Sequence, residues 1–332
     1  MMTVFIHVLA LIAGLGLLVK GADLFVDAAS QLAERLGVPP LVVGLTVVAL
    51  GTSAPEAAMA VASAATGAND MALAGVFGSN IVNTLVVLGV TAMVARVRVR
   101  RSTLRVEIPL VMGATALLLV LCAHDGQLGR VDALMLLALL TTHLVALVRG
   151  VRTQAGKGVA VAADATREKS AAAGPCEGGP AETRCPGGAL VVQGLLAVVA
   201  IFVGARLAVG GASELAQLAG VSARVVGLTV VAVGTSLPEL VTSLAATRRG
   251  QADLAVGNVV GSSLLNVLFV LGASGAIAPM PFSAALLFDG LVSLAAVAVL
   301  WAVSVRSRSL GRGGGAVLLG CYGTYLAAVL AG

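Results

Sequence analysis

Two short segments of this chain carry the same run of hydroxyl, proline and carboxylate residues. Residues 51–56 read GTSAPE and residues 234–239 read GTSLPE, each within a long apolar stretch. Their charged groups, Glu56 and Glu239, have no Lys, Arg or His at comparable depth to balance them. Two such carboxylates repel each other or take up protons unless a cation lies between them. With nearby hydroxyl, carbonyl and amide oxygens they predict a site for a hard cation such as Ca²⁺, which prefers about 6–8 oxygen ligands.

A second polar pattern follows each of these segments. Ser79 precedes Asn83 by four residues, and Ser262 precedes Asn266 by four, so each pair lies on one helical face. A buried amide needs hydrogen-bond partners, which favours a role for both asparagines in the same site. Simpler alternatives exist: the hydroxyls could bond to their own helix or pack helices together, and the glutamates could be protonated structural acids.

The composition excludes most other settings for these residues. Of the 332 residues, 58% are hydrophobic and 11% are charged, whereas a soluble domain has about 25% charged residues. A soluble enzyme, a disordered chain and a disulfide scaffold are excluded, and the basic residues lie between apolar runs instead of forming a nucleic-acid-binding face. A run of about 17–25 apolar residues can span a bilayer as a helix. The expected spans lie at about 2–19, 40–66, 71–95, 107–124, 131–148, 189–208, 225–247, 254–274, 282–304 and 313–331.

The basic residues predict how these ten helices are oriented. If the N-terminus lies outside and every helix crosses, all 21 Lys and Arg residues fall inside except Arg130, Arg206 and Arg224. This bias follows the positive-inside rule and predicts that both termini lie outside the cell (inner) membrane. Residues 150–188, rich in Ala, Gly, Pro and mixed charge, predict a flexible cytoplasmic linker. The expected division is a five-helix repeat at 1–149, this linker, and a second five-helix repeat at 189–332.

The two halves share sequence at a constant offset of 183 residues, as between residues 21 and 204. Five helices per half is an odd number, so the second half enters the membrane from the opposite side. Inverted repeats of this kind are typical of secondary transporters, whose substrate site lies near the midplane between the repeats. The matching segments are 21–38 with 204–221, 43–56 with 226–239, and 76–89 with 259–272.

Both glutamate segments fall in the middle of an expected span. Proline removes a helical hydrogen bond and clashes with the preceding turn, and glycine weakens the helix further. Each segment therefore predicts an interrupted helix. Its freed carbonyls must face a cavity within the protein, because lipid cannot satisfy them.

The remaining candidate residues predict little chemistry. Glu107 and Asp289 lie about a turn into their spans and are interpreted as anchors or caps at helix ends, with a role in ion access as the alternative. The three histidines are scattered and the four cysteines form no CxxC pair, so neither a soft-metal site nor a disulfide framework is expected. No phosphate-binding motif is complete, and no cofactor is expected.

With these motifs the chain resembles the calcium/cation antiporter superfamily, most closely its prokaryotic sodium/calcium exchanger branch. The resemblance rests on two inverted copies of GTSxPE, each followed by a GS pair and an asparagine, and it covers nearly the whole chain. It implies an all-α membrane fold in which helices 2, 3, 7 and 8 enclose the ion site. It also implies that the long, tilted helices 1 and 6 slide across that core.

The same resemblance implies roles for individual residues. Glu56 and Glu239 would be central carboxylates shared by Ca²⁺ and competing Na⁺, and Thr52 and Thr235 would complete the Ca²⁺ site. Some members carry Asp where this chain has Asn266, so this chain has one fewer central carboxylate. The further polar positions and Na⁺ ligands that it implies are Ser53, Ser79, Ser236, Ser262, Asn83, Asn266 and the carbonyls of Ala49 and Ala232.

The sequence thus predicts a secondary antiporter that exchanges Ca²⁺ for Na⁺ by alternating access, and not an enzyme. Its expected partners are the two transported ions and the lipid bilayer, with no nucleic acid and no obligate protein partner. The alternatives are an exchanger of H⁺ for Ca²⁺ or another divalent cation, and a passive cation channel. A membrane-embedded enzyme would need a nucleophile or a His-held metal, and the expected midplane offers neither.

Overall fold

The computed structural model describes residues 2–66, 69–169, 187–220 and 232–331, and almost all of this part is helical. In the first half the helices are α1 (Met2–Leu36), α2 (Pro40–Val43), α3 (Ala49–Thr52), α4 (Ala54–Thr66), α5 (Asn69–Val82), α6 (Leu88–Val94), α7 (Ile108–Asp125) and α8 (Arg130–Lys169). In the second half they are α9 (Gly187–Leu218), α11 (Ala232–Thr235), α12 (Leu237–Arg248), α13 (Ala252–Leu265), α14 (Leu271–Ile277), α15 (Ala284–Val305) and α16 (Arg312–Ala331). Widened π-helical turns are η1 (Gly44–Val48), η2 (Asn83–Val87), η3 (Thr103–Glu107) and η5 (Asn266–Val270).

The predicted all-α membrane fold is confirmed. Within the described residues, 8 stretches of helix are long and apolar enough to cross a membrane, and the bent pair Pro40–Thr52 with Ala54–Ala65 supplies a ninth. The remaining expected span, 225–247, begins among residues 221–231, which lie outside the described residues. Its described part consists of α11 and α12.

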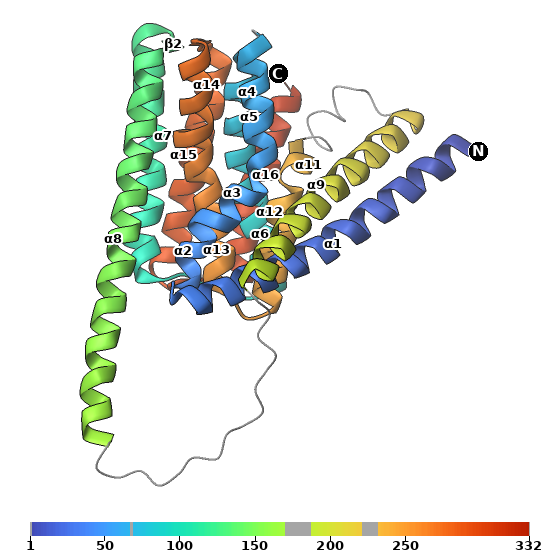
Figure 1. Cartoon of the computed structure of the whole chain (residues 1–332). Coiled ribbons are helices and arrows are strands. Elements are labelled where there is room, and N and C mark those ends of the chain that lie inside the picture. The colour runs from blue at the N-terminus through green and yellow to red at the C-terminus, as the bar shows by residue number, and fades with distance from the viewer. Residues whose placement is uncertain (1, 67–68, 170–186, 221–231, 332) are drawn as a thin grey trace.

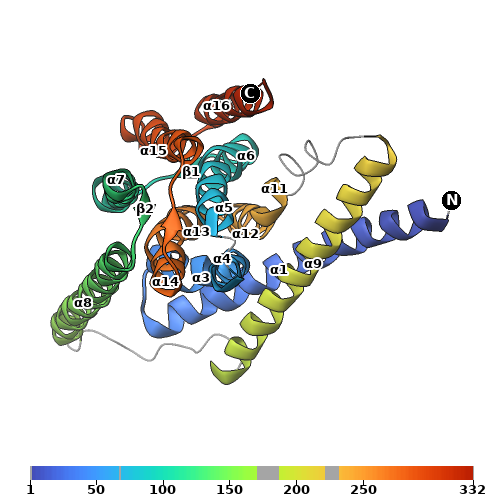
Figure 2. The ribbon, with the colours of Figure 1, turned by 90° about the horizontal axis from the view of Figure 1, so that it is seen from above.

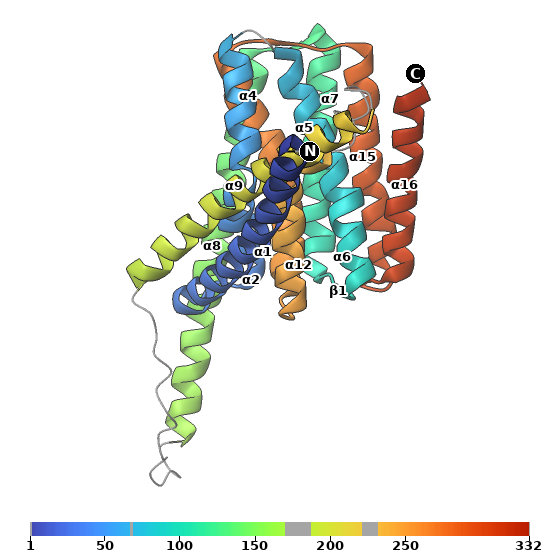
Figure 3. The same cartoon turned by 90° about the vertical axis from the view of Figure 1, so that its right-hand side faces the viewer.

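Helices α1 and α9 lie side by side and are strongly tilted against the upright helices of the rest of the molecule (Figures 1, 2 and 3). They touch backbone to backbone: a Cβ atom on Gly14 would lie 2.7 Å from the carbonyl oxygen of Gly204. Small residues allow this close approach in membrane helices. The prediction that the first helix ends at residue 19 was wrong, because α1 continues through Lys20 and Asp23 to Leu36.

The most deeply buried span runs from Ala252 to Ile277, with 94% of its apolar window buried inside the protein. It combines α13, η5 and α14, and the equivalent first-half span combines α5, η2 and α6. The widened turns η2 and η5 begin at Asn83 and Asn266, which are repeat-related positions. Helices α8, α7, α15 and α16 line one side of this core, and α1 and α9 cross the opposite side, as the view from above shows (Figure 2).

Two short antiparallel strand pairs connect the halves at opposite ends of the molecule (Figures 1 and 3). Strand β1 (Val97–Arg98) pairs with β4 (Ser309–Leu310), and β2 (Gln127–Leu128) pairs with β3 (Met280–Pro281). Each pair joins a loop of the first half to a loop of the second.

The predicted linker at 150–188 begins as a helix. Helix α8 continues without interruption to Lys169, where an Ala-rich sequence with Arg, Glu and Lys has high helix propensity. This helical start was not predicted from the sequence. The role of residues 150–188 as a flexible connection stays a prediction. Cys176 and Cys185 lie at 170–186, outside the described residues, while Cys122 and Cys321 are free thiols.

Candidate ion-binding site

The two GTSxPE segments break their helices in the same way. Helix α3 ends at Thr52 and α4 begins at Ala54, with a bend of 51° between the segments. Between them, Ser53 has φ −88° and ψ 5°. In the second half Ser236 lies between α11 and α12 with φ −94° and ψ 9°. The interrupted helices predicted from proline and glycine are confirmed.

Each break places a glutamate in the first turn of the helix that follows it. Glu56 is 5% exposed and Glu239 is 0% exposed. The partial positive charge of a helix N-terminus favours a carboxylate at this position. It offsets only part of the cost of burying two negative charges without a basic partner.

The break in the first half faces the second half directly. The Ser53 hydroxyl donates a hydrogen bond to Oε1 of Glu239 at 3.0 Å. The Thr52 hydroxyl donates to Oδ1 of Asn258 at 3.0 Å and lies 3.5 Å from the hydroxyl of Ser262. Helix α13 therefore contacts α3, and the Ser53–Glu239 bond joins the two GTSxPE segments at one buried site.

Buried amides complete the polar centre. Asn80 donates from Nδ2 to the carbonyl of Ser263 at 3.2 Å, and its Oδ1 accepts from Asn266 at 3.2 Å. Asn258 donates to the hydroxyl of Ser243 at 3.1 Å and to the carbonyl of Glu239 at 3.4 Å. These bonds hold α5, α12 and α13 together around the two glutamates.

Several buried oxygens at this centre have no hydrogen-bond partner within the described part of the chain. They are both carboxylate oxygens of Glu56, Oε2 of Glu239, Oδ1 of Asn83, Oδ1 of Asn266 and Oγ of Ser236. Buried acceptors are normally satisfied, so a group of unsatisfied ones in a native fold indicates a further partner such as an ion. Carboxylate, amide and hydroxyl oxygens form a donor set that suits Ca²⁺ and Na⁺ better than a soft metal.

Hydrogen-bond distances join Thr52 to Ser262 and Ser53 to Glu239 across the two halves, and most of the other predicted site residues are buried. Beside the two glutamates, the buried ones are Thr52, Ser53, Ser79, Asn83, Ser236, Ser262, Asn266 and Ala49. The carbonyl of Ala49 accepts from the Ser53 N–H at 2.9 Å. Thr235 is half-buried, and Ala232 begins helix α11. In the described ranges, no three His, Cys, Asp or Glu side chains gather as a metal centre.

Asn80, Asn258 and Ser243 were not predicted to belong to this centre. Residues 76–89 and 259–272 match well, but Asn80 stands opposite Ser263 in that match, so it carries no repeat signal. Asn258 stands opposite Gly75. The only sequence signal for these two asparagines is an isolated amide side chain inside an apolar span, where a buried amide requires hydrogen-bond partners.

Glu107 and Asp289 lie apart from the breaks and each contacts the following helix. His143 Nε2 lies 3.9 Å from Glu107 Oε2, and the Tyr325 hydroxyl donates to Asp289 Oδ1 at 3.0 Å. These contacts agree with the anchoring interpretation of both acids. His143 makes no hydrogen bond to Glu107, so its interpretation as incidental stays a prediction.

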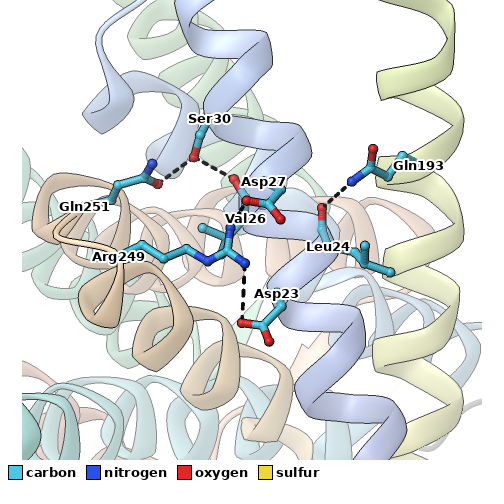
Figure 4. A network of polar contacts seen from close by, with 8 residues as sticks. All are labelled: Asp23, Leu24, Val26, Asp27, Ser30, Gln193, Arg249 and Gln251. Atoms are coloured by element: carbon cyan, nitrogen blue, oxygen red, sulfur yellow. Dashed lines mark hydrogen bonds and ion pairs between the residues drawn. The ribbon is translucent and has the colours of Figure 1, made fainter. Parts of the chain in front are cut away.

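One end of the tilted helix α1 is attached to the core by polar contacts (Figure 4). Arg249, after helix α12, forms ion pairs with Asp27 and with Asp23, the second at 3.7 Å. The Ser30 hydroxyl donates to Oε1 of Gln251 at 2.5 Å. We call these contacts the α1 latch.

Two broken helices with buried glutamates at a shared polar centre define a cation antiporter of the membrane, a class of transporter and not of enzyme. The chain belongs to the sodium/calcium exchanger family: the family described as sodium/calcium exchanger protein matches residues 6–149 and 189–331. This family transports Ca²⁺ and Na⁺ across membranes, and the chain is an integral membrane protein.

Relatives match over nearly the full length. The chain is 36% identical to the inner membrane protein YrbG of Escherichia coli (strain K12) over 323 residues, covering 96% of this chain and 94% of that protein. It is 30% identical to the sodium/calcium exchanger MaX1 of Methanosarcina acetivorans, covering 97% of each. Among solved structures, the sodium-calcium exchanger NCX_Mj soaked with zero Na⁺ and Ca²⁺ matches with a TM-score of 0.78 at 26% identity, covering 98% of this chain and 99% of that one.

Proposed function

We propose that this chain is a secondary antiporter that exchanges Ca²⁺ for Na⁺ by alternating access. The observation that carries the proposal is the hydrogen bond from Ser53 to Glu239, because it joins the break of one repeat to the carboxylate of the other. Two carboxylates neutralise one Ca²⁺. When Na⁺ competes for the same oxygens and only the loaded carrier crosses, the two ions exchange.

The unsatisfied buried oxygens support an assignment of ligands. Glu56, Glu239, Thr52 and Thr235 would bind Ca²⁺. The hydroxyls and carbonyls around them would bind Na⁺, namely those of Ser53, Ser236, Ser79, Ser262, Ala49 and Ala232. Asn83 and Asn266 supply further amide oxygens that lack a partner among the residues described.

The arrangement of α1 and α9 supports the alternating-access step. They pack on each other and lie across the upright core as a separate tilted pair (Figure 2). A movement of this pair along the core would open the central site to one side of the membrane and then to the other. Published structures of NCX_Mj concern extracellular ion exchange and binding-site occlusion in that protein.

We further propose that the chain lies in the cell (inner) membrane with both termini outside. The bias of Lys and Arg toward alternate loops supports this orientation. The E. coli relative YrbG is named as an inner membrane protein.

A flux assay tests the proposed exchange. Proteoliposomes loaded with Na⁺ should take up Ca²⁺ into a Na⁺-free medium, and uptake should vanish without the Na⁺ gradient. Glu56→Gln and Glu239→Gln should abolish it. Glu107→Gln is the matched control, because Glu107 is also a buried glutamate in a span but lies near His143 and not in either helix break. Uptake that ignores Na⁺ and follows a pH gradient would replace this proposal with H⁺/Ca²⁺ exchange, and conductance without counter-transport would indicate a channel.

A further inference from the structure

The two strand pairs are related by the internal repeat. Val97 of β1 and Met280 of β3 are 183 positions apart, the same offset as the rest of the repeat. Each pair is extended by one more backbone bond: Val99 N–H donates to the Arg308 carbonyl at 3.0 Å, and Phe282 N–H donates to the Gly126 carbonyl at 2.9 Å. We call residues 96–101 with 307–310 the basic strap, and residues 126–129 with 279–282 the neutral strap.

The side chains of the two straps differ sharply. The neutral strap reads GQLG and PMPF and has no charged residue, whereas the basic strap carries several arginines. Along β1 and its flanks, Arg96, Arg98 and Arg100 are exposed while Val97 and Val99 are buried, so the three arginines share one face. A cavity of about 780 Å³ lies on this face and is lined by Arg96, Arg98, Arg100, Arg101, Arg308 and one carboxylate, Asp253.

Only part of this positive charge is balanced. Arg96 donates to the Ser309 hydroxyl at 2.9 Å, and Arg100 pairs with Asp253 at 2.6 Å. Within the described ranges, the guanidinium groups of Arg98, Arg101 and Arg308 form no hydrogen bond or ion pair. Three guanidinium groups at one cavity form a site for an anion, and their planar donors suit phosphate oxygens in particular.

The backbone of Arg308 gives an independent indication that this cavity binds a ligand. Arg308 has φ +48° and is the only residue other than glycine with positive φ in the described part of the chain. The residue whose carbonyl occupies the same hydrogen-bonding position in the neutral strap is Gly126, with φ +67°, and glycine adopts this conformation freely. An arginine here costs stability relative to glycine, and such local strain is found where a side chain has a functional role.

A second cavity of about 490 Å³ adjoins the first and shares Arg96, Ser307 and Ser309 with it. Apart from these residues and Arg312, its lining comes from small and apolar groups at the ends of α6, α15 and α16, including Val94, Val303 and Gly314. A basic cavity beside an apolar one at the end of membrane spans matches a lipid with a charged headgroup and an acyl chain.

We propose that the basic strap binds the phosphate headgroup of an anionic membrane lipid. The phosphate contacts Arg98, Arg101 and Arg308, and an acyl chain follows the adjoining cavity. The positive-inside rule accounts for basic residues at this end of the molecule. It does not account for their convergence on one cavity or for an arginine at a position that favours glycine.

Native mass spectrometry of the full chain in detergent tests this binding, with phosphatidylglycerol, phosphatidylcholine and inorganic phosphate as the three probes. The wild type should bind phosphatidylglycerol on the order of 10-fold more tightly than phosphatidylcholine. The triple variant R98Q/R101Q/R308Q should lose this preference. The matched control R105Q/R248Q/R306Q removes the same charge from exposed arginines outside the cavity and should keep it.

Arg308→Gly separates binding from folding. It should raise the melting temperature in neutral detergent, because it relieves the left-handed arginine, and yet weaken phosphatidylglycerol binding several-fold. Equal loss of preference in both triple variants would overturn the proposal in favour of diffuse surface charge. Retained preference in R98Q/R101Q/R308Q would also overturn it. Tight binding of inorganic phosphate with no gain from the lipid would overturn the lipid assignment and indicate a soluble phosphate ligand.

Discussion

Ser53 and Ser236 occupy the same position in the two halves and have backbone angles within 6° of each other in φ (−88° and −94°). Their hydroxyl groups nevertheless differ, because Ser53 donates to Glu239 while Ser236 has no partner among the described residues. Glu239 accordingly has one oxygen bonded by the protein, and Glu56 has none. The repeat therefore supplies two similar breaks but two different carboxylates. Glu56 is the one whose oxygens are both available to an ion.

The largest expected effect tests whether the two carboxylates are unequal. Removing one member of a buried charged contact costs about 2–5 kcal/mol, which corresponds to a loss of affinity of roughly 30-fold or more. We expect Glu56→Gln to weaken Ca²⁺ binding more than Glu239→Gln, because both oxygens of the Glu56 carboxylate are free of hydrogen bonds from the described residues and only one oxygen of Glu239 is. Isothermal titration with Ca²⁺ in Na⁺-free buffer measures both, with Glu107→Gln as the control. An equal loss would show that ion binding removes the Ser53 contact and makes the two sides equivalent.

The next effect tests the serine pair directly. Ser53→Ala removes a hydrogen bond to a charged group, worth about 1.5–3 kcal/mol, so Ca²⁺ affinity should fall by roughly 10- to 100-fold. Ser236→Ala removes a hydroxyl that makes no such bond, and its effect on Ca²⁺ affinity in Na⁺-free buffer should stay within about 3-fold. The same titration measures both variants. A larger loss for Ser236→Ala than for Ser53→Ala would reverse the asymmetry inferred from the contacts.

A third comparison concerns how closely the breaks approach the tilted helices. A Cβ on Gly51 would lie 2.9 Å from the ring end of Phe25 on α1, whereas a Cβ on Gly234 would overlap the side chain of Val209 on α9. Valine is stiff because it is β-branched, so Gly234→Ala should disturb the contact more than Gly51→Ala. Overpacking costs about 1–3 kcal/mol, and we expect Na⁺-driven Ca²⁺ uptake to slow by about 10-fold in Gly234→Ala. Gly113→Ala, with open space around its Cβ, is the control. Normal uptake in Gly234→Ala would show that α9 does not have to keep this contact during transport.

The central carboxylates could be predicted from sequence because two independent signals meet at them. Glu56 and Glu239 are charged groups in apolar spans, and they also coincide under the repeat offset. Thr52 and Ser53 share that offset with Thr235 and Ser236. The helix breaks could be predicted from proline and glycine alone, because the effect of these residues on a helix is local.

Residues that lack a repeat partner could not be found in this way. Asn258 contacts Thr52, Ser243 and Glu239, but its repeat position is Gly75, so only the packing of α13 against α3 and α12 reveals it. The end of α1 was also misjudged, because polar residues that end an apolar run do not end a helix when they find partners. Asp23 and Asp27 find Arg249. Such partners are set by tertiary contacts, which no local pattern encodes.

The smallest expected effect concerns the α1 latch, which the repeat does not reproduce. At the offset of 183, Asp23 corresponds to Arg206 and Asp27 to Gly210, so α9 carries no matching acids. Because these contacts hold only one end of α1, they should favour one of the two positions that α1 would take along the core during alternating access. The paired groups are about one-third to two-fifths exposed (33% and 43%), so solvent screening limits their coupling to about 1 kcal/mol or less. A double-mutant cycle of Arg249→Gln with Asp27→Asn should give that coupling in thermal stability, and Arg249→Gln should change the uptake rate by no more than about 5-fold. Arg248→Gln, an exposed neighbour, should change neither measurement. Zero coupling in the cycle would mean that the backbone packing of α1 against α9 and α12, rather than the latch, sets the position of α1.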